Sequence, residues 1–281
     1  MKNADELKRL VREKYSEIAQ QSKSVNEKSC CGAGDCGTVD YTIFSDDYSG
    51  LEGYNPDADL GLGCGLPTEY AQIKAGDTVV DLGSGAGNDC FVARSIAGES
   101  GKVIGIDMTQ AMIDKARANA AKLGFKNVEF RLGEIEDIPM GSNLADVVVS
   151  NCVLNLVPNK SQAFSEIYRI LKPGGHFSIS DVVIEGELPV SLKADAEMYA
   201  GCVAGAIQME EYLGIIGKTG FEEITVQKKK TIQLPDAILL QYLNEEELEA
   251  YRQGSIGIYS ITVFGRKPAR ESRCQPGNGC C

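Results

Sequence analysis

The chain has 281 residues, enough to bury roughly 75% of the surface of its unfolded form in one large domain with appendages. It carries 28 Lys and Arg residues against 40 Asp and Glu residues, which gives a net charge of -12 at pH 7. The basic residues form no dense stripe that could neutralise a run of phosphates, so no nucleic-acid partner is expected. The run Lys228–Lys230 is expected to be a solvated strand end.

The amino-terminal segment is charged throughout. Residues 1–21 contain no apolar stretch long enough for a signal peptide or a membrane span, so we expect a cytoplasmic protein without membrane contact. Within this segment, residues 4–19 place Leu7, Val11 and Ile18 at helical spacing. They predict an amphipathic helix that packs on a larger body and could cover a ligand site.

Cysteine is abundant, with 10 residues in the chain. They stand at Cys30, Cys31, Cys36, Cys64, Cys90, Cys152, Cys202, Cys274, Cys280 and Cys281. Without an export signal, such thiols are expected to serve redox or soft-ion chemistry and not a disulfide framework. The first four lie in residues 22–66, where turn-forming residues are frequent and no period is sustained. We interpret this segment as a long functional loop with a short helical piece.

From Thr78 onward, short apolar runs alternate with helical stretches, a pattern typical of a parallel sheet covered on both faces. The expected strands are residues 78–82, 102–106, 128–132, 145–150 and 176–184. Helices are expected near residues 89–97, 110–123 and 161–171. With right-handed crossovers, these elements predict an α/β fold with a doubly wound, mostly parallel sheet.

The carboxyl-terminal third continues this pattern less regularly. Residues 192–219 are expected to be helical, and two late strands near 222–228 and 256–266 could pair as an antiparallel edge, joined by a helical insert containing NEEELEAY. The tail, residues 267–281, has almost no apolar content apart from its cysteines and is expected to be disordered in isolation.

The segment VVDLGSGAG, residues 79–87, joins a predicted strand to a predicted helix through glycines that let the backbone approach a ligand closely. Asn88 follows where the dinucleotide motif has its third glycine, so the spacing disfavours NAD. The segment resembles instead motif I of the class I S-adenosylmethionine methyltransferases. The resemblance assigns cofactor binding to Asp81, Gly83, Gly85 and Gly87.

Three further motifs of that family follow in order. Asp107, in VIGIDMT, stands where the family places the carboxylate that accepts both ribose hydroxyls, and Met108 beside it would pack on adenine. LGEIEDIP resembles the adenine segment, with Glu134 or its backbone near the exocyclic amine and Ile135 against the ring, although Asp is commoner at the first of these positions. LKPGG, residues 171–175, resembles the turn into strand five. Because each motif alone could be a turn or a helix cap, the ordered set carries the prediction of a Rossmann-like methyltransferase that uses S-adenosylmethionine.

The acceptor is indicated by a cysteine where a base would be expected. Cys152, in SNCVLNL, leaves strand four at the carboxyl edge of the sheet, and Asn151 before it is expected on the cofactor side. Methyltransferases acting on oxygen or nitrogen commonly place a general base there, yet the chain has a single histidine, His176. Three thiolates can replace the three hydroxyls of arsenite and leave arsenic with a nucleophilic lone pair, which needs no base. The residues therefore favour trivalent arsenic.

Four cysteine motifs resemble the arsenite methyltransferases over nearly the whole chain: SCCG near residue 30, GLGCG, SNCVLNL and YAGCVAGA. The resemblance implies that Cys64, Cys152 and Cys202 hold arsenic and that a fourth, amino-terminal cysteine takes part in relay or reduction. Cys30, Cys31 and Cys36 all remain candidates for that role, with Cys31 preferred. It also implies arsenite and methylated arsenicals as ligands, and a thiol reductant, either glutathione or a thioredoxin-like protein.

These assignments divide the chain into four parts. They are the amino-terminal helix and Cys-rich loop at 1–70, the S-adenosylmethionine-binding core at 71–188, the arsenic-binding helical segment and late strands at 189–266, and the tail at 267–281. Cys90 is expected to be buried packing. The tail cysteines, Cys274, Cys280 and Cys281, have no place in the core pattern and could capture arsenic. A monomer is expected.

Two rival functions remain open at this point. One is a methyltransferase of a quinone or another small organic acceptor, which needs neither Cys64 nor Cys202. The other is a non-enzymatic metalloid-sequestering protein that keeps the nucleotide fold as a scaffold. A zinc site is disfavoured, because paired and widely spaced cysteines fit C-x-x-C zinc patterns poorly.

Overall fold

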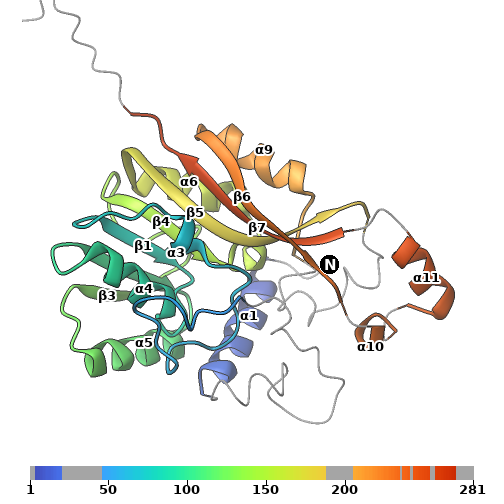
Figure 1. Cartoon of the computed structure of the whole chain (residues 1–281), viewed down its shortest axis with the longest axis horizontal. Coiled ribbons are helices and arrows are strands. Elements are labelled where there is room, and N and C mark those ends of the chain that lie inside the picture. The colour runs from blue at the N-terminus through green and yellow to red at the C-terminus, as the bar shows by residue number, and fades with distance from the viewer. Residues whose placement is uncertain are drawn as a thin grey trace, which may run out of the picture.

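Figure 1 shows the computed structural model of the protein, which describes residues 4–20, 46–187, 205–234, 236–240, 243–253 and 257–269. Within these ranges the fold is built on a 7-stranded sheet with the order β3-β2-β1-β4-β5-β7-β6. The expected class I methyltransferase architecture, a mostly parallel sheet with an antiparallel edge, is confirmed.

The parallel part of the sheet contains the five strands expected from the sequence. They are β1 (Thr78–Leu82), β2 (Lys102–Asp107), β3 (Val128–Leu132), β4 (Ala145–Asn151) and β5 (Leu171–Glu185). All four pairings among them are parallel. β5 begins earlier than expected, because LKPGG is part of the strand and not a separate turn. Gly174 has a φ of 82° there, and the register with β4 shifts between Ala145 and Val147.

Helices cover both faces of this sheet, as alternate side chains of β1 show. Val79 packs in a cluster with residues of α4 (Asn88–Ala97) and α5 (Gln110–Leu123). Val80 packs in a cluster with α6 (Lys160–Ile170) and α9 (Met209–Thr219) on the opposite face. Burial on both faces explains why the strands are almost continuously apolar. The expected core helices are confirmed to within one residue at each end.

The late strands form the predicted antiparallel edge. β7 (Gly257–Arg266) pairs with β5 and also with β6 (Glu222–Ile232), which is the outermost strand. β6 runs four residues beyond its expected end, so Lys228–Lys230 lie inside a strand and not at its end. Lys228 and Lys230 form ion pairs with Asp46 at 2.7 and 3.1 Å. These ion pairs hold the start of the segment 46–66 against β6.

Short helices complete the described parts of the carboxyl-terminal third. Residues 209–219 of the expected 192–219 helix form α9, but residues 205–208 are not helical, and residues 188–204 lie outside the described ranges. α10 (Asp236–Leu239) and α11 (Glu245–Gln253) lie between β6 and β7 in the chain. α11 contains the predicted segment NEEELEAY apart from its first residue, Asn244. Among the helices of the described residues, none is long and apolar enough to cross a membrane.

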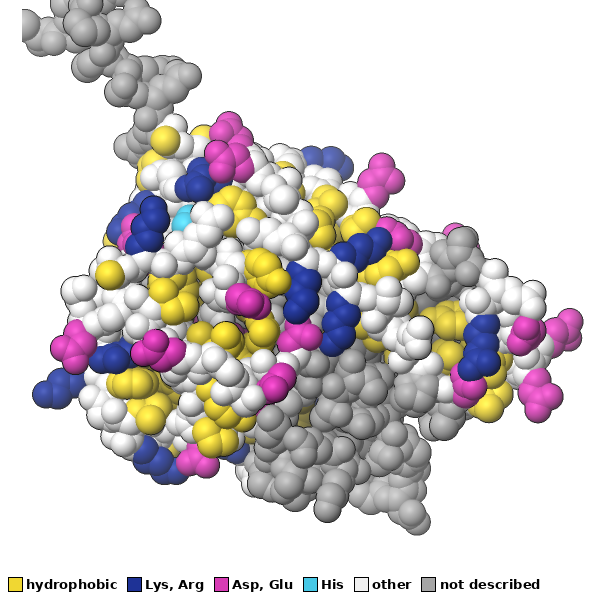
Figure 2. All heavy atoms as spheres, viewed as in Figure 1, with side chains coloured by type: hydrophobic (Ala, Val, Ile, Leu, Met, Phe, Trp, Pro, Cys, Tyr) yellow, Lys and Arg dark blue, Asp and Glu magenta, His cyan; other side chains and the backbone are white. Residues whose placement is uncertain are grey.

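The amino-terminal helix α1 (Ala4–Ala19) forms as predicted and lies beside the carboxyl ends of the strands (Figure 1). Its buried residues Val11, Ile18 and Ala19 face the body, where α1 contacts α5 and the short 3-10 helix η2 (Leu154–Leu156). Residues 46–66 of the long loop form no helix, and α3 (Pro67–Tyr70) follows them. On the face shown in Figure 2, acidic and basic side chains are interspersed over the described surface.

Candidate donor and acceptor site

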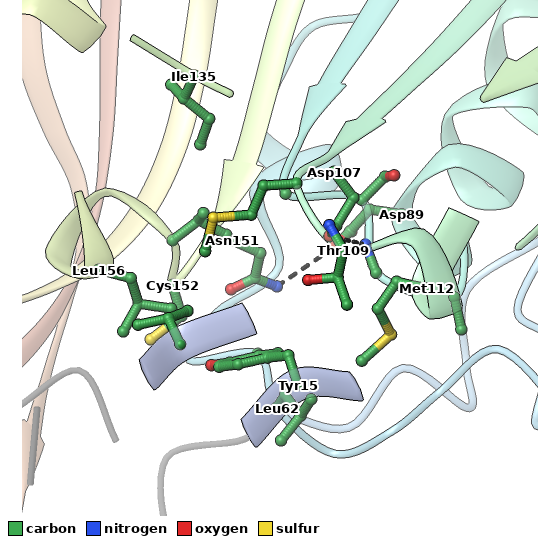
Figure 3. Close-up of a pocket in the computed structure, with 18 of the residues that line it drawn as sticks. Tyr15, Leu62, Asp89, Asp107, Thr109, Met112, Ile135, Asn151, Cys152 and Leu156 are labelled. Carbon is green, nitrogen blue, oxygen red and sulfur yellow. Dashed lines mark hydrogen bonds between the residues drawn. The ribbon is translucent and has the colours of Figure 1, made fainter. Parts of the chain in front are cut away.

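A cavity opens at the carboxyl ends of the parallel strands, where ligands bind in open α/β sheets. Its floor is formed by the ends of three neighbouring strands, at Gly83–Gly85 after β1, Asp107 and Met108 at the end of β2, and Asn151 and Cys152 at the end of β4. Glu134 and Ile135, after β3, close one side. Lys8, Val11 and Tyr15 of α1 complete the wall. Figure 3 shows Tyr15 beside the cavity.

Most of the residues predicted to bind the cofactor line this cavity. They are Gly83, Gly85, Asp107, Met108, Glu134, Ile135 and Asn151. Asp81 and Gly87 are not among the lining residues. Gly87 has a φ of 99°, and a Cβ there would meet the rings of Phe91 and Phe130 at 2.9 Å, so the glycine is required by packing under the loop.

Asp81 is buried beneath the glycine loop. Cys90 donates its thiol hydrogen to Asp81 Oδ2 at 3.2 Å, so the cysteine predicted to be packing is indeed buried and also has a polar contact. Burial raises the pKa of the Asp81 carboxyl well above its usual range, and the negative charge of Asp89 raises it further. Asp81 therefore contacts α4 and does not line the cavity.

Asp107 presents a carboxylate to the middle of the cavity. It accepts hydrogen bonds from the backbone N–H of Thr109 at 2.8 Å and of Gly85 at 3.0 Å. Burial raises its pKa, and these two backbone bonds act in the opposite direction. A carboxylate has about four lone-pair positions, so Asp107 keeps acceptor capacity for a ligand with two hydroxyls.

Glu134 contacts α1 in a way the sequence did not indicate. Lys8 Nζ lies 2.7 Å from Glu134 Oε2, and Arg12 pairs with the other carboxylate oxygen. Lys8 also pairs with Glu136. The hydrogen bond from Lys8 is the largest influence on Glu134 and lowers the pKa of its carboxyl. These ion pairs hold α1 against the segment after β3.

Cys152 stands at the junction of the cavity with a neighbouring apolar cluster. It is 5% exposed and has a φ of 60°, a left-handed conformation that is uncommon for a residue other than glycine. Its N–H donates to Ser180 O at 2.7 Å, which fixes the turn after β4. Strained backbone of this kind is concentrated at functional sites.

Cys64 is fully buried and packs in the same apolar cluster as Cys152, together with Val11, Leu156 and Ile258. It does not line the cavity itself. The structure therefore brings together two of the three predicted arsenic-binding thiols. Cys202 and the relay candidates Cys30, Cys31 and Cys36 lie outside the described residues, as do Cys274, Cys280 and Cys281.

The side chain of Asn151 holds the loop that carries Cys64. Asn151 Oδ1 accepts from the N–H of Cys64 at 3.0 Å and of Gly65 at 3.3 Å, while Nδ2 donates to Gly65 O at 2.8 Å. A Cβ on Gly63 would lie 2.6 Å from this amide nitrogen, so the loop needs glycine there. Because Asn151 lies 86 or 87 residues from these partners in the sequence, no local sequence signal could reveal the contacts.

Tyr48 and Asp89 extend this network, and sequence reasoning missed both. The Tyr48 hydroxyl lies 3.0 and 2.9 Å from the two carboxylate oxygens of Asp89 and 3.1 Å from Gly65 O. Asn151 Nδ2 donates to Tyr48 Oη and, at 3.3 Å, to Asp89 Oδ2. Burial raises the pKa of Asp89 to about 6, and the nearby Asp59 adds to the shift, against these hydrogen bonds.

A second buried acid, Asp181, belongs to β5. Tyr212 donates to Asp181 Oδ2 at 3.2 Å, and burial raises the pKa of Asp181 to about 7. The pKa of Tyr212 is also raised, chiefly by burial and by Asp181, with smaller influences from Cys64 and Cys152. Tyr212 is thus within electrostatic range of both thiols.

Comparison with known proteins places these features in a wider group. The sequence profile described as "Methyltransferase domain" matches residues 73–231. The chain is 40% identical to an arsenite methyltransferase of Halobacterium salinarum, over 96% of this chain and 69% of that protein. It is 33% identical to an arsenite methyltransferase of Aquipseudomonas alcaligenes, over 84% of this chain and 68% of that protein.

A solved structure agrees with the sequence relatives. CrArsM, an arsenic(III) S-adenosylmethionine methyltransferase from Chlamydomonas reinhardtii, superimposes with a TM-score of 0.61 at 34% identity. The match covers 76% of this chain and 69% of that chain.

Proposed function

The chain belongs to the arsenite methyltransferase family, and we propose that it transfers the methyl group of S-adenosylmethionine to trivalent arsenic held by cysteine thiolates. The observation that carries the proposal is the position of Cys152. Its side chain lines the cavity at the end of β4 and also packs in the cluster that contains Cys64. Donor and acceptor would therefore meet at one residue.

The donor fits the residues that line the cavity. Asp107 would accept the ribose hydroxyls, Met108 and Ile135 would pack on adenine, and Gly83–Gly85 would let the backbone approach the ligand. The Glu134 carboxylate faces Lys8 and Arg12, which favours its backbone for the adenine amine. When bound, S-adenosylmethionine supplies an electrophilic methyl group on a sulfonium. Asp81 and Gly87 would support this loop without touching the ligand.

The acceptor needs three thiols, of which the described residues supply Cys64 and Cys152. With Cys202 as the third, each thiol would replace one hydroxyl of arsenite and release one water. Arsenic in this state keeps a lone pair, so the protein needs only to hold it close to the methyl group, and no general base is required. Burial of both described cysteines would exclude competing ligands from the arsenic.

The product arsenic must be reduced before the site can work again. Methyl transfer converts trivalent arsenic to the pentavalent state, and two electrons restore it. We propose that a thiol reductant, either glutathione or a thioredoxin-like protein, supplies them, with Cys31 as the relay. We also propose that Cys274, Cys280 and Cys281 of the tail capture arsenic for this site.

The organisation of the chain follows from these roles. The core at 71–188 would bind the donor, residues 189–266 would complete the arsenic site, residues 1–70 would cover it, and residues 267–281 would form the tail. We further propose that the protein acts as a cytoplasmic monomer. Size-exclusion chromatography of the protein with light-scattering detection tests the oligomeric state.

The proposed reaction can be tested directly. The purified chain is incubated with S-adenosylmethionine carrying an isotopically labelled methyl group, arsenite and glutathione, and arsenic species are separated by chromatography with mass detection. We expect labelled methylarsenicals to appear together with S-adenosylhomocysteine. Donor binding without any methylated arsenic would contradict the proposal and would favour an organic acceptor.

A further inference from the structure

Asp181 is a buried acid that the proposed function does not use. It lies in β5, has no exposed surface and is not among the residues that line the cavity. Tyr212 of α9, which is equally buried and packs against β5, donates its hydroxyl hydrogen to Asp181 Oδ2 at 3.2 Å. Burying a carboxylate costs free energy, and such groups are concentrated where a protein uses their charge.

Two contacts connect this part of β5 to the turn that carries Cys152. The N–H of Cys152 donates to the carbonyl oxygen of Ser180, the residue before Asp181, at 2.7 Å. The N–H of Asn155, three residues after Cys152, donates to the Asp181 carboxylate. The Asp181 carboxylate is therefore fixed against the segment that begins with the thiol at the cavity.

Cys64 contacts the same part of the sheet through β7. Ser260 Oγ donates to Cys64 O, and Ser260 is the register partner of Val182, the residue after Asp181. Val182 also packs in the apolar cluster that contains Cys64 and Cys152. The residues on both sides of Asp181 thus join β5 to the two segments that carry the thiols.

Neutral donors hold the Asp181 carboxylate in place. They are the N–H of Val182 at 3.0 Å, the hydroxyl of Tyr212 and the N–H of Asn155. Burial raises the pKa of Asp181 to about 7, while the charge of Lys160 in α6 and these hydrogen bonds lower it. Near neutral pH the carboxyl is therefore partly ionised, and a positive charge close by would favour its ionised form.

Methyl transfer moves a positive charge toward the thiols. The lone pair of arsenic forms the new arsenic–carbon bond, while the carbon–sulfur bond of the sulfonium breaks and its electron pair stays on sulfur. Because three thiolates leave trivalent arsenic neutral, the positive charge passes from the sulfonium to arsenic. A fixed charge that is stronger in its effect on the transition state than on the ground state accelerates such a step, above all in a buried, weakly screened site.

We propose that the ionised carboxylate of Asp181 stabilises the positive charge that develops on arsenic during methyl transfer, with Tyr212 orienting the carboxylate. This inference rests on the proposed function, because it requires arsenic at Cys152. The carboxylates that line the cavity, such as Asp107, belong to the end that would bind the donor, from which the charge departs. Asp181 acts at the end where the charge arrives.

Single-turnover methyl transfer tests this role. Protein loaded with arsenite is mixed with saturating S-adenosylmethionine and quenched at short times across a range of pH, so that ionisation of free thiols does not enter. Moving a unit charge about 3 Å toward a carboxylate at an effective dielectric constant of about 20 changes a rate about three- to tenfold. The rate constant of the wild type should exceed that of Asp181→Asn by this ratio at high pH. The ratio should approach one as the pH falls through about 7, where Asp181 becomes neutral.

Two further variants separate this effect from a structural one. Tyr212→Phe removes a hydrogen bond that lowers the pKa of Asp181, so the loss of rate on acidification should begin at a higher pH than in the wild type. Glu166→Gln is the matched control, because Glu166 is a buried carboxylate of α6 that pairs with Arg169 at 2.7 Å and has a lowered pKa. Its rate relative to the wild type should not vary with pH.

Two measurements do not depend on turnover. Isothermal titration should give affinities for arsenite and S-adenosylhomocysteine within about threefold of the wild type in Asp181→Asn, because the substitution keeps the shape of the side chain and an acceptor for Tyr212. Carbon NMR of protein labelled at the aspartate carboxyl groups should show one group that titrates near pH 7 and is missing in Asp181→Asn.

The inference is overturned if the ratio of the wild-type rate to the Asp181→Asn rate is the same at every pH, which is the result of a structural defect. It is also overturned if Tyr212→Phe leaves the pH dependence unchanged, and this comparison decides the question if Asp181→Asn does not fold. If methylated arsenic forms but the ratio does not vary with pH, this inference alone fails. If the wild type binds both ligands and forms no methylated arsenic, the proposed function fails with it.

Discussion

The donor side and the acceptor side of the cavity are built in different ways. The donor side comes from one continuous stretch of chain, residues 78–135, in which strand ends and backbone N–H groups define positions such as Asp107. The acceptor side joins the Cys64 loop to β4 and β7 through side chains, chiefly Asn151 and Ser260, whose hydroxyl donates to Cys64 O. Single substitutions should therefore separate arsenic binding from donor binding.

The largest separation is expected for Cys152→Ser. An alcohol is a poor ligand for trivalent arsenic, so methylarsenical formation should fall at least about 100-fold, while S-adenosylhomocysteine affinity should stay within about threefold. Product analysis and titration measure the two effects. Cys90→Ser is the matched control, because it keeps a donor to Asp81 and should retain activity. Equal activity of both variants would refute the thiol site.

A smaller but still large effect is expected for Gly63→Ala. The added Cβ would lie 2.6 Å from Asn151 Nδ2, so the amide must move and release the Cys64 loop. Buried backbone groups that lose their partners should cost about 1–3 kcal/mol of the free energy of unfolding, and arsenite affinity should decrease with little change in donor affinity. Denaturant titration and arsenite binding measure this.

Gly50→Ala is the control for that substitution, because a Cβ at Gly50 meets nothing within 4 Å. It should change neither stability nor binding. If Gly63→Ala weakens donor binding as much as arsenite binding, the donor side and the acceptor side are not independent.

The pH dependence of stability should show a moderate effect, which originates at Asp89. The folded pKa of Asp89 is about 6, above its ordinary value of 3.8, and Tyr48, Asp59, Asp81 and Asn151 are the groups that influence it or contact it.

The direction of this effect follows from the raised pKa. Because the folded pKa of Asp89 is raised, the folded state takes up its proton first, and this residue's destabilising contribution at neutral pH is relieved as pH falls from about 6 toward 4. Comparing wild type with Asp89→Asn by thermal unfolding isolates this contribution. A pH dependence of stability that is identical in both proteins would contradict the raised pKa of Asp89.

The smallest effect is expected at α1. Replacing Lys8 or Arg12 by Met removes partly exposed ion pairs with Glu134, each worth about 0.2–1 kcal/mol, so donor affinity should decrease about two- to fivefold and become less sensitive to salt. Titration at low and high ionic strength tests this. Arg9→Met is the control, since Arg9 pairs only with Glu13 of α1 itself among the described residues.

The residues of the donor side could be predicted from the sequence because their motifs are local. The spacing of VVDLGSGAG and the acidic end of β2 indicate the position of Gly83 and Asp107 directly, and the strand pattern gives the sheet around them. The prediction for Asp81 was incomplete because the sequence does not show where its side chain points. An acidic residue two positions before the glycine can pack against Cys90 as well as line the cavity.

The acceptor side was less predictable because its contacts join distant segments. Cysteine motifs indicated Cys64 and Cys152, yet nothing near Tyr48 suggests that its hydroxyl contacts Asp89, 41 residues away, and Asn151, 103 residues away. The ion pairs of Glu134 could not be predicted either, because Lys8 and Arg12 belong to a helix whose pattern predicts only amphipathic packing. Side-chain networks of this kind follow from the tertiary fold.

Arsenic X-ray absorption spectroscopy tests the central claim most directly, because it counts the sulfur ligands of arsenic bound to the protein. The experiment uses arsenite with a chain in which Cys274, Cys280 and Cys281 are replaced by Ser, so that tail thiols cannot contribute. We predict three sulfur ligands and no oxygen ligand, and loss of one sulfur in the Cys152→Ser variant. Oxygen ligands in the first protein, or three sulfur ligands in the variant, would contradict the account.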